Sequence, residues 1–417
     1  MLNNYICALD ISSSKIAAVV AGIKKRQIAD IFFETLPVKG MKKGTIVNSI
    51  DLVSSITNAL KNLKGKSGIN IKSIYTNISG TAIVTKHSGA VIPLAERGNK
   101  VITSTDIQKV NEQARILGSS LDEETIHQII HGYSIDSHAS VLNPLGLYSH
   151  RLAVDLYLVC AKLSFIQSLI RTVNQAGYEI KDAFLTGLAT SQAVFNDGLK
   201  KGLTLLCDVG SDITELLLFK DGILQDIAIL SSGGDDLTMH LSEELKVPFD
   251  LAQDIKQSHA ILGDYSQIDG NKEILVKQNN AYKSLNQRAI CETLTPKAKF
   301  ICQGIRAAVV KLVPLEDLSN FIVTGRTTLL EGFLEALENT LGIPVKLGRL
   351  TSPYLVFLAN KNNNLSGQKY LTYLTCLGII CQALYEQKPQ PLSDYQPTCN
   401  PVLKTINKVK EIYQEYF

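Results

Sequence analysis

Two stretches of the chain share the same order of apolar and polar positions, although the chain separates them widely. Residues 5–22 read YICALDISSSKIAAVVAG, and residues 204–222 read TLLCDVGSDITELLLFKDG. In each, an apolar run ends at an Asp, either Asp10 or Asp208, and a short turn containing Ser leads to a second apolar run. Apolar runs bounded by turn residues predict two strand–turn–strand hairpins, and their similarity predicts a duplicated fold.

The turns of both hairpins carry residues suited to phosphate. Backbone N–H groups and hydroxyls at such a turn can be presented to a phosphate group. Phosphate held between two like halves is the pattern of the actin, Hsp70 and sugar-kinase superfamily, which this chain resembles. We therefore expect an α/β fold with two related halves. The Asp221–Gly222 pair predicts a tight turn at the end of the second hairpin.

The rest of the chain alternates between helical and strand patterns. Apolar residues at helical spacing predict helices over 51–63, 104–118 and 163–177. Polar residues are expected to cap these helices, namely Asp51, Ser104 or Thr105, and Ser164. Alternation predicts paired strands within 73–94 and further strands over 127–136 and 151–161. Farther along we expect helices in 241–247, 251–263, 297–313 and 370–384, and a strand, glycine turn and helix in 321–342.

Composition argues against several classes of protein. At 417 residues the chain is long enough for two or more domains. Its formal net charge of +3 and its lack of Trp argue against a nucleic-acid partner. The eight cysteines form no CxxC pair, which predicts buried free thiols in a reducing cytosol. We expect no signal peptide, and the most apolar segment, 370–384, is too short to span a bilayer.

The end of the chain has a different composition. Residues 386–401 hold four of the twelve prolines and predict a semi-extended linker. Residues 402–417 predict either an amphipathic helix that lies in a membrane interface or a helix that folds back on its own domain. Three Lys against two Glu leave only about +1 on this segment, so one copy should bind lipid weakly and a polymer more strongly. Its apolar side chains are Val402, Leu403, Ile406, Val409, Ile412, Tyr413, Tyr416 and Phe417.

The order of these features resembles the FtsA family of actin-like bacterial cell-division proteins, over essentially the whole chain. The most specific segments are KGMKKGTIVN (39–48), NISGTAI (77–83), YSID (133–136), NPLGLYSHRL (143–152) and LTGLATSQAV (185–194), together with the tethered tail. The resemblance implies a polymer-forming scaffold that recruits the tubulin-like protein FtsZ, through its C-terminal tail, to the cytoplasmic face of the inner membrane. Other proteins of the division machinery are implied as further partners.

The family's fold implies a division of the chain into four subdomains. Subdomain 1A would take residues 1–82, 164–200 and 370–387, and an inserted subdomain of the SHS2 type, called 1C, would take 83–163. Subdomain 2A would take 201–240 and 315–369, and subdomain 2B would take 241–314. The linker would then be 388–401, followed by the membrane-targeting helix 402–417.

The resemblance also implies an ATP site with Mg²⁺, carried by both hairpins. In the first loop, Asp10 would act on Mg²⁺ through water, while Ser13, Ser14 and Lys15 match the family's phosphate loop. Ser12 stands where the family has Gly, which would allow unusual backbone angles. In the second loop, Asp208, Gly210 and Thr214 match the family, and Ser211 stands in place of a Gly. Asp208 would also act on Mg²⁺ through water.

Further residues are implied on the adenosine side, where the chain departs from the family. Gly233 and Gly234 resemble the glycine turn after the second hairpin, and Lys256 matches a family Lys, but Gln253 replaces Glu. The adenosine turn ends in Gly325–Arg326 instead of two glycines. Asp212 would place a carboxylate where phosphate oxygens lie, at a cost on the order of 1–4 kcal/mol. Two hypotheses stay open, a degenerate pocket or ATP binding with little hydrolysis, and no general base is evident.

Two other groups of side chains have more than one interpretation. Lys297, Lys299 and Arg306 form either a solvated helix face or a docking surface for the FtsZ tail, which the family binds with subdomain 2B. His127 and His131 are four residues apart, as in half a zinc motif, but the segment predicts a strand with both rings on one face, and we assign them a structural role.

Three other functions are alternatives. A pilus-assembly actin-like protein shares the 1C arrangement but typically lacks the linker and amphipathic tail. A sugar- or acid-kinase-type phosphotransferase would have an intact Gly-rich second loop, which this chain lacks. An Hsp70-type chaperone would need a C-terminal peptide-binding domain, for which no residues remain.

Overall fold

The computed structural model of the chain describes residues 4–386, except 26, 97, 137–139, 264, 267, 279–280, 353–354, 357 and 359–361. The described residues form two compact units. Unit 1 contains the chain up to Gln192, the segment Ile223–Gln225 and the segment from Thr375. Unit 2 contains Ala193–Gly222 and Asp226–Leu374. The residues predicted as linker and terminal helix, 388–417, lie outside the described residues.

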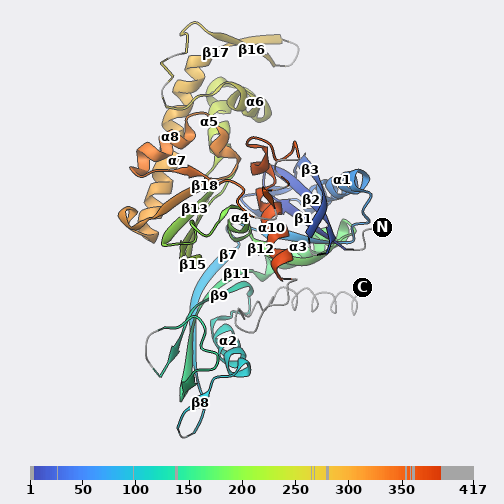
Figure 1. Cartoon of the computed structure of the whole chain (residues 1–417). Helices are drawn as coiled ribbons and strands as arrows, with labels where there is room; N and C mark the ends of the chain where they lie inside the picture. Colours follow the sequence, from blue (N-terminus) through green and yellow to red (C-terminus); the bar gives the residue numbers. More distant parts are fainter. Residues whose placement is uncertain are drawn as a thin grey trace. The chain divides into compact units, whose positions relative to one another are not determined.

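Unit 1 is built on a five-stranded sheet of order β12-β6-β1-β2-β3 (Figure 1). The predicted first hairpin is confirmed, because β1 pairs with β2 antiparallel along its whole length. Strand β6 lies parallel to β1 on its other side. The edge strand β3 was not predicted. These strands span Tyr5–Ile11 (β1), Lys15–Lys24 (β2), Gln27–Pro37 (β3), Ser73–Ile78 (β6) and Glu179–Leu185 (β12), and a two-stranded ribbon follows from Met41–Lys42 (β4) and Thr45–Ile46 (β5).

Helices cover both faces of this sheet. On one face α1 (Ser49–Ser67) and α3 (Leu163–Gln175) share a core with apolar side chains of β1 and β2. The helices α4 (Thr186–Val194) and α10 (Leu374–Glu386) contact each other closely, because a Cβ at Gly378 would collide with the carbonyl of Ala189. The Cys376 Sγ of α10 lies 3.3 Å from the carbonyl oxygen of Ala17 in β2. The buried helix predicted over 370–384 is therefore present as α10, which begins at Leu374 after a 3₁₀ turn at Lys369–Thr372.

The helix caps differ from the predicted ones by a few residues. Helix α1 is capped by Asn48, whose side chain accepts hydrogen bonds from the N–H groups of Ile50 and Asp51. Helix α2 (Ser104–Gly118) is capped by Thr103 in a reciprocal capping box with Asp106. Helix α3 begins without a side-chain cap. The predictions of Asp51, Ser104 or Thr105, and Ser164 were thus wrong, because several adjacent residues can make the same capping bond.

An inserted region of unit 1 has a sheet of its own. Its three strands have the order β7-β11-β9 and span Ile83–Pro93 (β7), Glu123–Ile135 (β9) and Arg151–Lys162 (β11). Helix α2 packs on one face of this sheet around a core that includes Leu152, Leu156 and Leu158. A short ribbon joins Lys100–Val101 (β8) to Tyr148–Ser149 (β10). The predicted pairing within 73–94 is wrong, because β6 joins the first sheet and β7 pairs with β11 instead.

Unit 2 is built on a second five-stranded sheet, of order β15-β14-β13-β18-β19. Helices α5, α6, α7 and α8 share a core with β13, β14 and β18. The strands span Leu203–Val209 (β13), Thr214–Lys220 (β14), Ile223–Leu230 (β15), Asn320–Thr324 (β18) and Lys346–Leu347 (β19). The helices span Gly234–Leu245 (α5), Phe249–His259 (α6), Gln287–Leu312 (α7) and Phe333–Leu341 (α8), with 3₁₀ turns at Leu315–Asp317 and Arg326–Leu329 and a hairpin of Glu273–Gln278 (β16) and Ala281–Asn286 (β17).

The two large sheets have the same strand order, which confirms the predicted duplication. The hairpin β1–β2 corresponds to β13–β14, and the parallel neighbours β6 and β18 correspond to each other. The predicted tight turn is also present, with Asp221 and Gly222 both at positive φ. Asp10 and Asp208 are the second-last residues of equivalent strands, so the repeated sequence pattern marks a repeated position in the fold.

Two expectations from composition can be compared with the described residues. The seven cysteines among them are all buried and unbridged, and Cys399 lies outside the described part of the chain. Burial raises the pKa of thiols such as Cys7, Cys207 and Cys376, which keeps them protonated and unreactive. In the part of the chain that the structure describes, no helix has both the length and the apolar character needed to cross a bilayer.

Candidate phosphate-binding loops

The first loop, in unit 1, holds Asp10 in a buried network. The Lys15 Nζ donates to Asp10 Oδ2 at 2.9 Å, and the Asn77 amide donates to Asp10 Oδ1 at 2.9 Å. Asn77 also accepts a hydrogen bond from the Ile11 N–H at 2.8 Å. Because Asn77 lies at the end of β6, the parallel neighbour of β1, the sheet itself positions the Asp10 carboxylate. Asn77 was not among the predicted site residues, since it is 67 positions away in sequence.

The turn of the first loop is unstrained in spite of the Ser12 departure. The Ser12 N–H donates to the Lys15 carbonyl at 3.1 Å, and its hydroxyl donates to the same oxygen at 2.9 Å. Ser12 is absent from the residues at positive φ, so the position does not require Gly. The Ser13 Oγ accepts from the Gly44 N–H at 3.3 Å, and Ser12, Ser13 and Ser14 are all partly exposed. The loop therefore presents three hydroxyls and the Lys15 ammonium around one buried carboxylate.

The second loop, in unit 2, repeats the backbone geometry of the first. The Gly210 N–H donates to the Ile213 carbonyl at 2.9 Å, as Ser12 does to Lys15. The carbonyl of Gly210 accepts from Thr327 Oγ1 at 2.7 Å, and Thr214 Oγ1 donates to the Ser232 carbonyl at 2.8 Å. Thr327 was not predicted as part of the site.

The carboxyl ends of the parallel strands β13 and β18 meet at this second loop. Asp208 lies opposite Thr324 in the register, and Gly325 follows with φ 92°. A Cβ at Gly325 would lie 2.6 Å from Asp208 Oδ1 and closer still to the Val209 carbonyl, so only Gly fits. The carboxyl ends of parallel strands are where open α/β sheets bind ligands.

Glycines and a buried lysine line the same end of unit 2. A Cβ at Gly233 would collide with the carbonyls of Gly210 and Ser211. The Lys256 Nζ, on α6, donates to the Gly234 carbonyl and to Thr238 Oγ1, both at 2.6 Å. Burial lowers the pKa of Lys256 to about 8, an effect that the Asp235 carboxylate opposes and the Arg326 guanidinium strengthens. Gln253 lies one helical turn before Lys256 and is partly buried, whereas Arg326 is exposed.

Carboxylates give the second loop a negative character that the first loop lacks. Burial raises the pKa of Asp235, at the first turn of α5, and the neighbouring Asp212 and Asp236 carboxylates raise it further, against the opposing effect of Lys256. The N-terminus of α5 attracts negative charge, and Asp236 already accepts from the Gly233 N–H at 2.9 Å. Phosphate oxygens beside Asp208 and Asp212 would need a divalent cation between them.

Each loop by itself fits part of a magnesium nucleotide. The first supplies Lys15, hydroxyls and one carboxylate. The second supplies carboxylates for a cation, two glycine positions that leave no room for a side chain, and the Lys256 ammonium. The polar groups of each loop are of the kinds that can hold phosphate or Mg²⁺. Among the described residues of either loop, no two groups are placed like a nucleophile and its base.

The three basic residues predicted as a docking surface do not share one side of α7. Lys299 and Arg306 are both exposed and seven residues apart, which is two turns of the helix. Lys297 is partly buried, and its ammonium lies over the Phe300 ring, 5.5 Å from the centroid. Two residues correspond to about 200° around a helix, so Lys297 lies on the opposite flank from Lys299. The exposed Val310 shares the stripe of Lys299 and Arg306.

The comparisons with known proteins agree with this architecture. The family model of an SHS2 domain inserted in FtsA matches residues 80–160, and the model of cell division protein FtsA matches residues 205–374. Among solved structures, a chain of a PilM–PilN type IV pilus biogenesis complex matches this one with a TM-score of 0.59 at 13% sequence identity. The match covers 91% of this chain and 98% of the solved chain. The ethanolamine utilization protein EutJ of Carboxydothermus hydrogenoformans has a TM-score of 0.50 at 15% identity, covering 91% and 89%. The chain therefore has an actin-like ATPase fold with an inserted SHS2 domain.

Curated relatives narrow this class to one family. Cell division protein FtsA of Borreliella burgdorferi is 25% identical over 424 residues, covering 100% of this chain and 99% of the relative. The protein of the same name from Pseudomonas aeruginosa is 26% identical over 347 residues, covering 82% of each. This chain belongs to the FtsA family of cell division proteins. The pilus-assembly alternative shares the fold, but both matched family models are those of FtsA.

Proposed function

We propose that this FtsA-family protein is a division scaffold that binds a magnesium nucleotide, polymerises, and attaches FtsZ to the cytoplasmic face of the inner membrane. The observation that carries the proposal is the repeated sheet, in which Asp10 and Asp208 are the second-last residues of equivalent strands. A nucleotide favours whichever conformation of the protein gives it more contacts. The nucleotide thus has a conformational role here, and we assign no catalytic residue.

The membrane attachment is assigned to residues 402–417. Each large apolar side chain contributes at most about 1.5–3 kcal/mol when fully buried and less at an interface. With a segment charge of only about +1, one chain would bind reversibly. Polymerisation would present several such segments at once, so attachment would follow assembly through avidity.

Liposome co-sedimentation tests this attachment. The full chain should pellet with vesicles, and a chain ending at Pro401 should stay in solution. The variant Ile406→Glu, within the full chain, should behave like the truncation, whereas Asn407→Glu, off the apolar stripe, should still pellet. Equal pelleting of the full and truncated chains, or solubility of both with and without ATP, would contradict the proposal.

We assign FtsZ-tail docking to the stripe of Lys299, Arg306 and Val310 on α7. An acidic, partly apolar tail is complementary to two cations and an exposed apolar side chain along two to three turns of one helix. Rim charges of this kind contribute modestly, so we expect the double change Lys299→Glu/Arg306→Glu to weaken binding of a tail peptide by at least about ten-fold. Lys297→Glu is the matched control, because Lys297 lies on the opposite flank and should leave the affinity nearly unchanged. Equal effects of the two changes would exclude this stripe.

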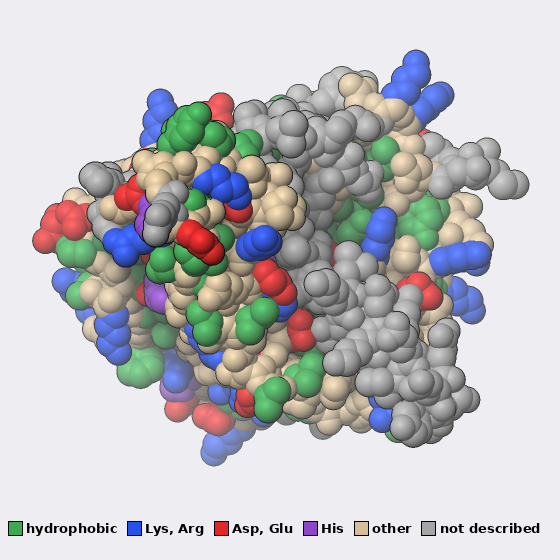
Figure 2. All heavy atoms as spheres, turned by 90° about the horizontal axis from the view of Figure 1, so that it is seen from below, with side chains coloured by type: hydrophobic (Ala, Val, Ile, Leu, Met, Phe, Trp, Pro, Cys, Tyr) green, Lys and Arg blue, Asp and Glu red, His purple; other side chains and the backbone are tan. Residues whose placement is uncertain are grey.

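Self-association has candidate surfaces on the inserted domain. Exposed apolar side chains there include Leu121, Leu142 and Tyr148, with exposed fractions of 63% or more. Figure 2 shows apolar side chains interspersed with both signs of charge on the face seen from below. Apolar groups with a charged surround are typical of protein interfaces, and we propose this domain as one contact of the polymer.

A further inference from the structure

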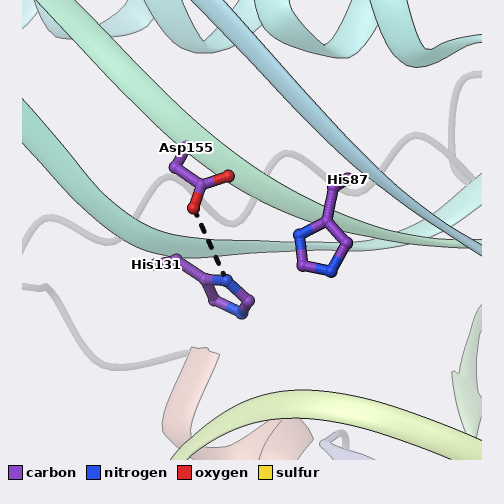
Figure 3. Close-up of side chains that lie close together, drawn as sticks. All are labelled: His87, His131 and Asp155. Carbon is purple, nitrogen blue, oxygen red and sulfur yellow. Dashed lines mark ion pairs between the residues drawn. The ribbon is translucent and has the colours of Figure 1, made fainter.

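Three side chains that the predicted functions do not use gather on the sheet of the inserted domain. His87 comes from β7, Asp155 from β11 and His131 from β9, the three adjacent strands of that sheet (Figure 3). One ligand atom from each lies within 4.8 Å of the other two. The His131 Nδ1 and the Asp155 Oδ2 are 3.8 Å apart. These three residues are separated by 24 to 68 positions in sequence, so only the strand register brings them together.

A β-bulge directs His131 toward the other two. The register of β9 against β11 shifts directly after Asp155. Asp155 pairs with Gly132, whereas the next residue of β11 pairs with Ile130, so His131 is the extra residue of the bulge. Bulges of this kind re-aim a side chain and are common at functional sites. Asp155 is flanked by Gly132 on one neighbouring strand and Gly89 on the other, so neither neighbour has a side chain that covers the carboxylate.

The ring of Tyr157 forms the floor beneath the two histidines. His131 stacks on it, with centroids 5.6 Å apart and planes 9° apart, and His87 meets it edge-on at 5.0 Å. Tyr157 is buried, whereas His87 and Asp155 are exposed and His131 is partly exposed. The two histidine rings are therefore supported from below by Tyr157, and the side chains of His87 and Asp155 are open to solvent.

The hydrogen bond of His131 selects a tautomer. Its Nε2 lies 2.9 Å from the carbonyl oxygen of Leu224, which clusters with unit 1. A carbonyl only accepts, so Nε2 carries the proton in the neutral ring, and the lone pair is on Nδ1, which faces Asp155. Donation of the second ring N–H to a backbone carbonyl is the arrangement of histidines that bind metals. A lone pair and a carboxylate that face each other also favour a cation between them.

His127, the partner that spacing alone suggests for His131, has a different role. Its Nε2 accepts a hydrogen bond from the Leu185 N–H at 2.9 Å, and its ring stacks on Phe184. Burial lowers its pKa to about 4, so it stays neutral. The structural role predicted for His127 fits these contacts, and the ring nitrogen that could bind an ion is already engaged.

We propose that His87, His131 and Asp155 bind a transition-metal dication of the Zn²⁺ type that ties the three strands together, with a fourth position open to water or to a partner's donor. Two imidazoles and one carboxylate are a donor set that suits Zn²⁺ and not Mg²⁺ or Ca²⁺. Tetrahedral ligands at Zn²⁺ lie about 3.4 Å from one another. The exposed side chains of His87 and Asp155 would therefore turn inward by about 1 Å, which their open surroundings allow.

Titration of the untagged full chain with Zn²⁺ in the presence of excess Mg²⁺ tests the site. We expect one equivalent to bind, and the variants His87→Ala and Asp155→Asn each to weaken binding by at least about ten-fold. Because both residues are exposed, these variants should keep the circular dichroism spectrum of the wild type. His150→Ala is the matched control, since His150 is an exposed histidine of the same domain outside the group and should not change the affinity.

Cobalt substitution separates this site from the cysteines. Co²⁺ bound by imidazole and carboxylate should give visible absorption without the near-ultraviolet charge-transfer band of a thiolate ligand. The proposal would be overturned by no Zn²⁺ binding to the wild type, by binding that both variants leave unchanged, or by a thiolate band. None of these readouts depends on nucleotide, lipid or FtsZ, so the proposal stands or fails separately from the division function.

Discussion

The two hairpin tips have the same backbone geometry but carry different charged side chains. In register, Ser12, Ser13, Ser14 and Lys15 of the first loop correspond to Gly210, Ser211, Asp212 and Ile213 of the second. Both loops close with an N–H to carbonyl hydrogen bond between their first and last residues, of 3.1 Å and 2.9 Å. The first loop places Lys15 beside its Asp, whereas the second has an apolar residue in that position and a carboxylate one residue earlier.

This difference changes how each tip could accommodate a phosphate. The first tip carries its own cation, and Asp10 is neutralised by Lys15 within the fold. The second tip carries Asp208 and Asp212, and a divalent cation would favour phosphate beside these carboxylates. The two loops thus share their backbone geometry but differ in the charged side chains that they carry, and the following changes test this comparison.

Replacing Lys15 with Ile, the residue at the equivalent position of the second loop, should have the largest effect. It leaves Asp10, 4% exposed, without its ion-pair partner, and breaking a buried pair in this way costs about 3–5 kcal/mol. Native-state hydrogen exchange of the β1–β2 amides measures the loss. The double change Asp10→Asn/Lys15→Ile should restore much of the stability, and an equally unstable double variant would refute the explanation.

Gly325→Ala should have the next largest effect, on unit 2. The new Cβ collides with the Val209 carbonyl and the Asp208 carboxylate at a position with φ 92°, which we expect to cost about 3 kcal/mol and to abolish nucleotide binding. Gly342→Ala is the matched control, because Gly342 has φ 74° but open space around it. It should cost only about 1 kcal/mol. Thermal unfolding and hydrogen exchange of β13 measure both, and similar costs for the two variants would show that the contact with Asp208 is unimportant.

Asp212→Ser gives the second loop the residue that the first loop has at the equivalent position, Ser14. Removal of one carboxylate near the phosphates should tighten nucleotide binding by about ten-fold and reduce its dependence on Mg²⁺. The reciprocal change, Ser14→Asp, should weaken binding by a similar factor. Fluorescent-nucleotide titrations at several Mg²⁺ concentrations measure both, and the account requires the two changes to act in opposite directions.

The pH dependence of unit 2 should show the smallest effect. Burial lowers the pKa of Lys256 from 10.5 to about 8, so above pH 8 the unfolded chain binds more protons than the folded one. The contribution of this group to stability therefore rises with pH, by about 1 kcal/mol between pH 7.5 and 9. Comparison of wild type with Lys256→Met isolates this contribution. A difference between the two proteins that stays constant over this range would contradict it.

The local pattern predicted the hairpins because everything needed to form them lies within about 20 residues. The pairing of β6 and β7 was predicted wrongly for the same reason, since two adjacent strand patterns indicate a hairpin whereas their partners, β1 and β11, lie elsewhere in the chain. The edge strand β3 was missed because the charged residues Asp30 and Glu34 interrupt its apolar residues, which blurs the alternation; Asp30 is exposed, whereas Glu34 is buried.

The residues of the candidate site that lie on the two hairpin loops could be predicted from the sequence. Asn77 and Thr327 were missed because they reach the loops from neighbouring elements across 66 or more positions. The Ser12 position does not need the unusual backbone angles that Gly would allow, since Ser12 is not at positive φ. The group of His87, His131 and Asp155 depends on strand register and a bulge, neither of which single-sequence patterns specify. In contrast, helix geometry alone is enough to predict that Lys297 lies on the opposite flank of α7 from Lys299.

Titration of the full chain with ATP, with Mg²⁺ and then with EDTA in place of Mg²⁺, tests the central claim most directly. If the second tip needs a cation to accept phosphate, the wild type should bind one equivalent with Mg²⁺ and at least about ten-fold more weakly without it. Gly325→Ala should lose this binding, whereas the matched control Gly342→Ala should keep it. No binding in the presence of Mg²⁺, or binding that survives Gly325→Ala, would contradict the account.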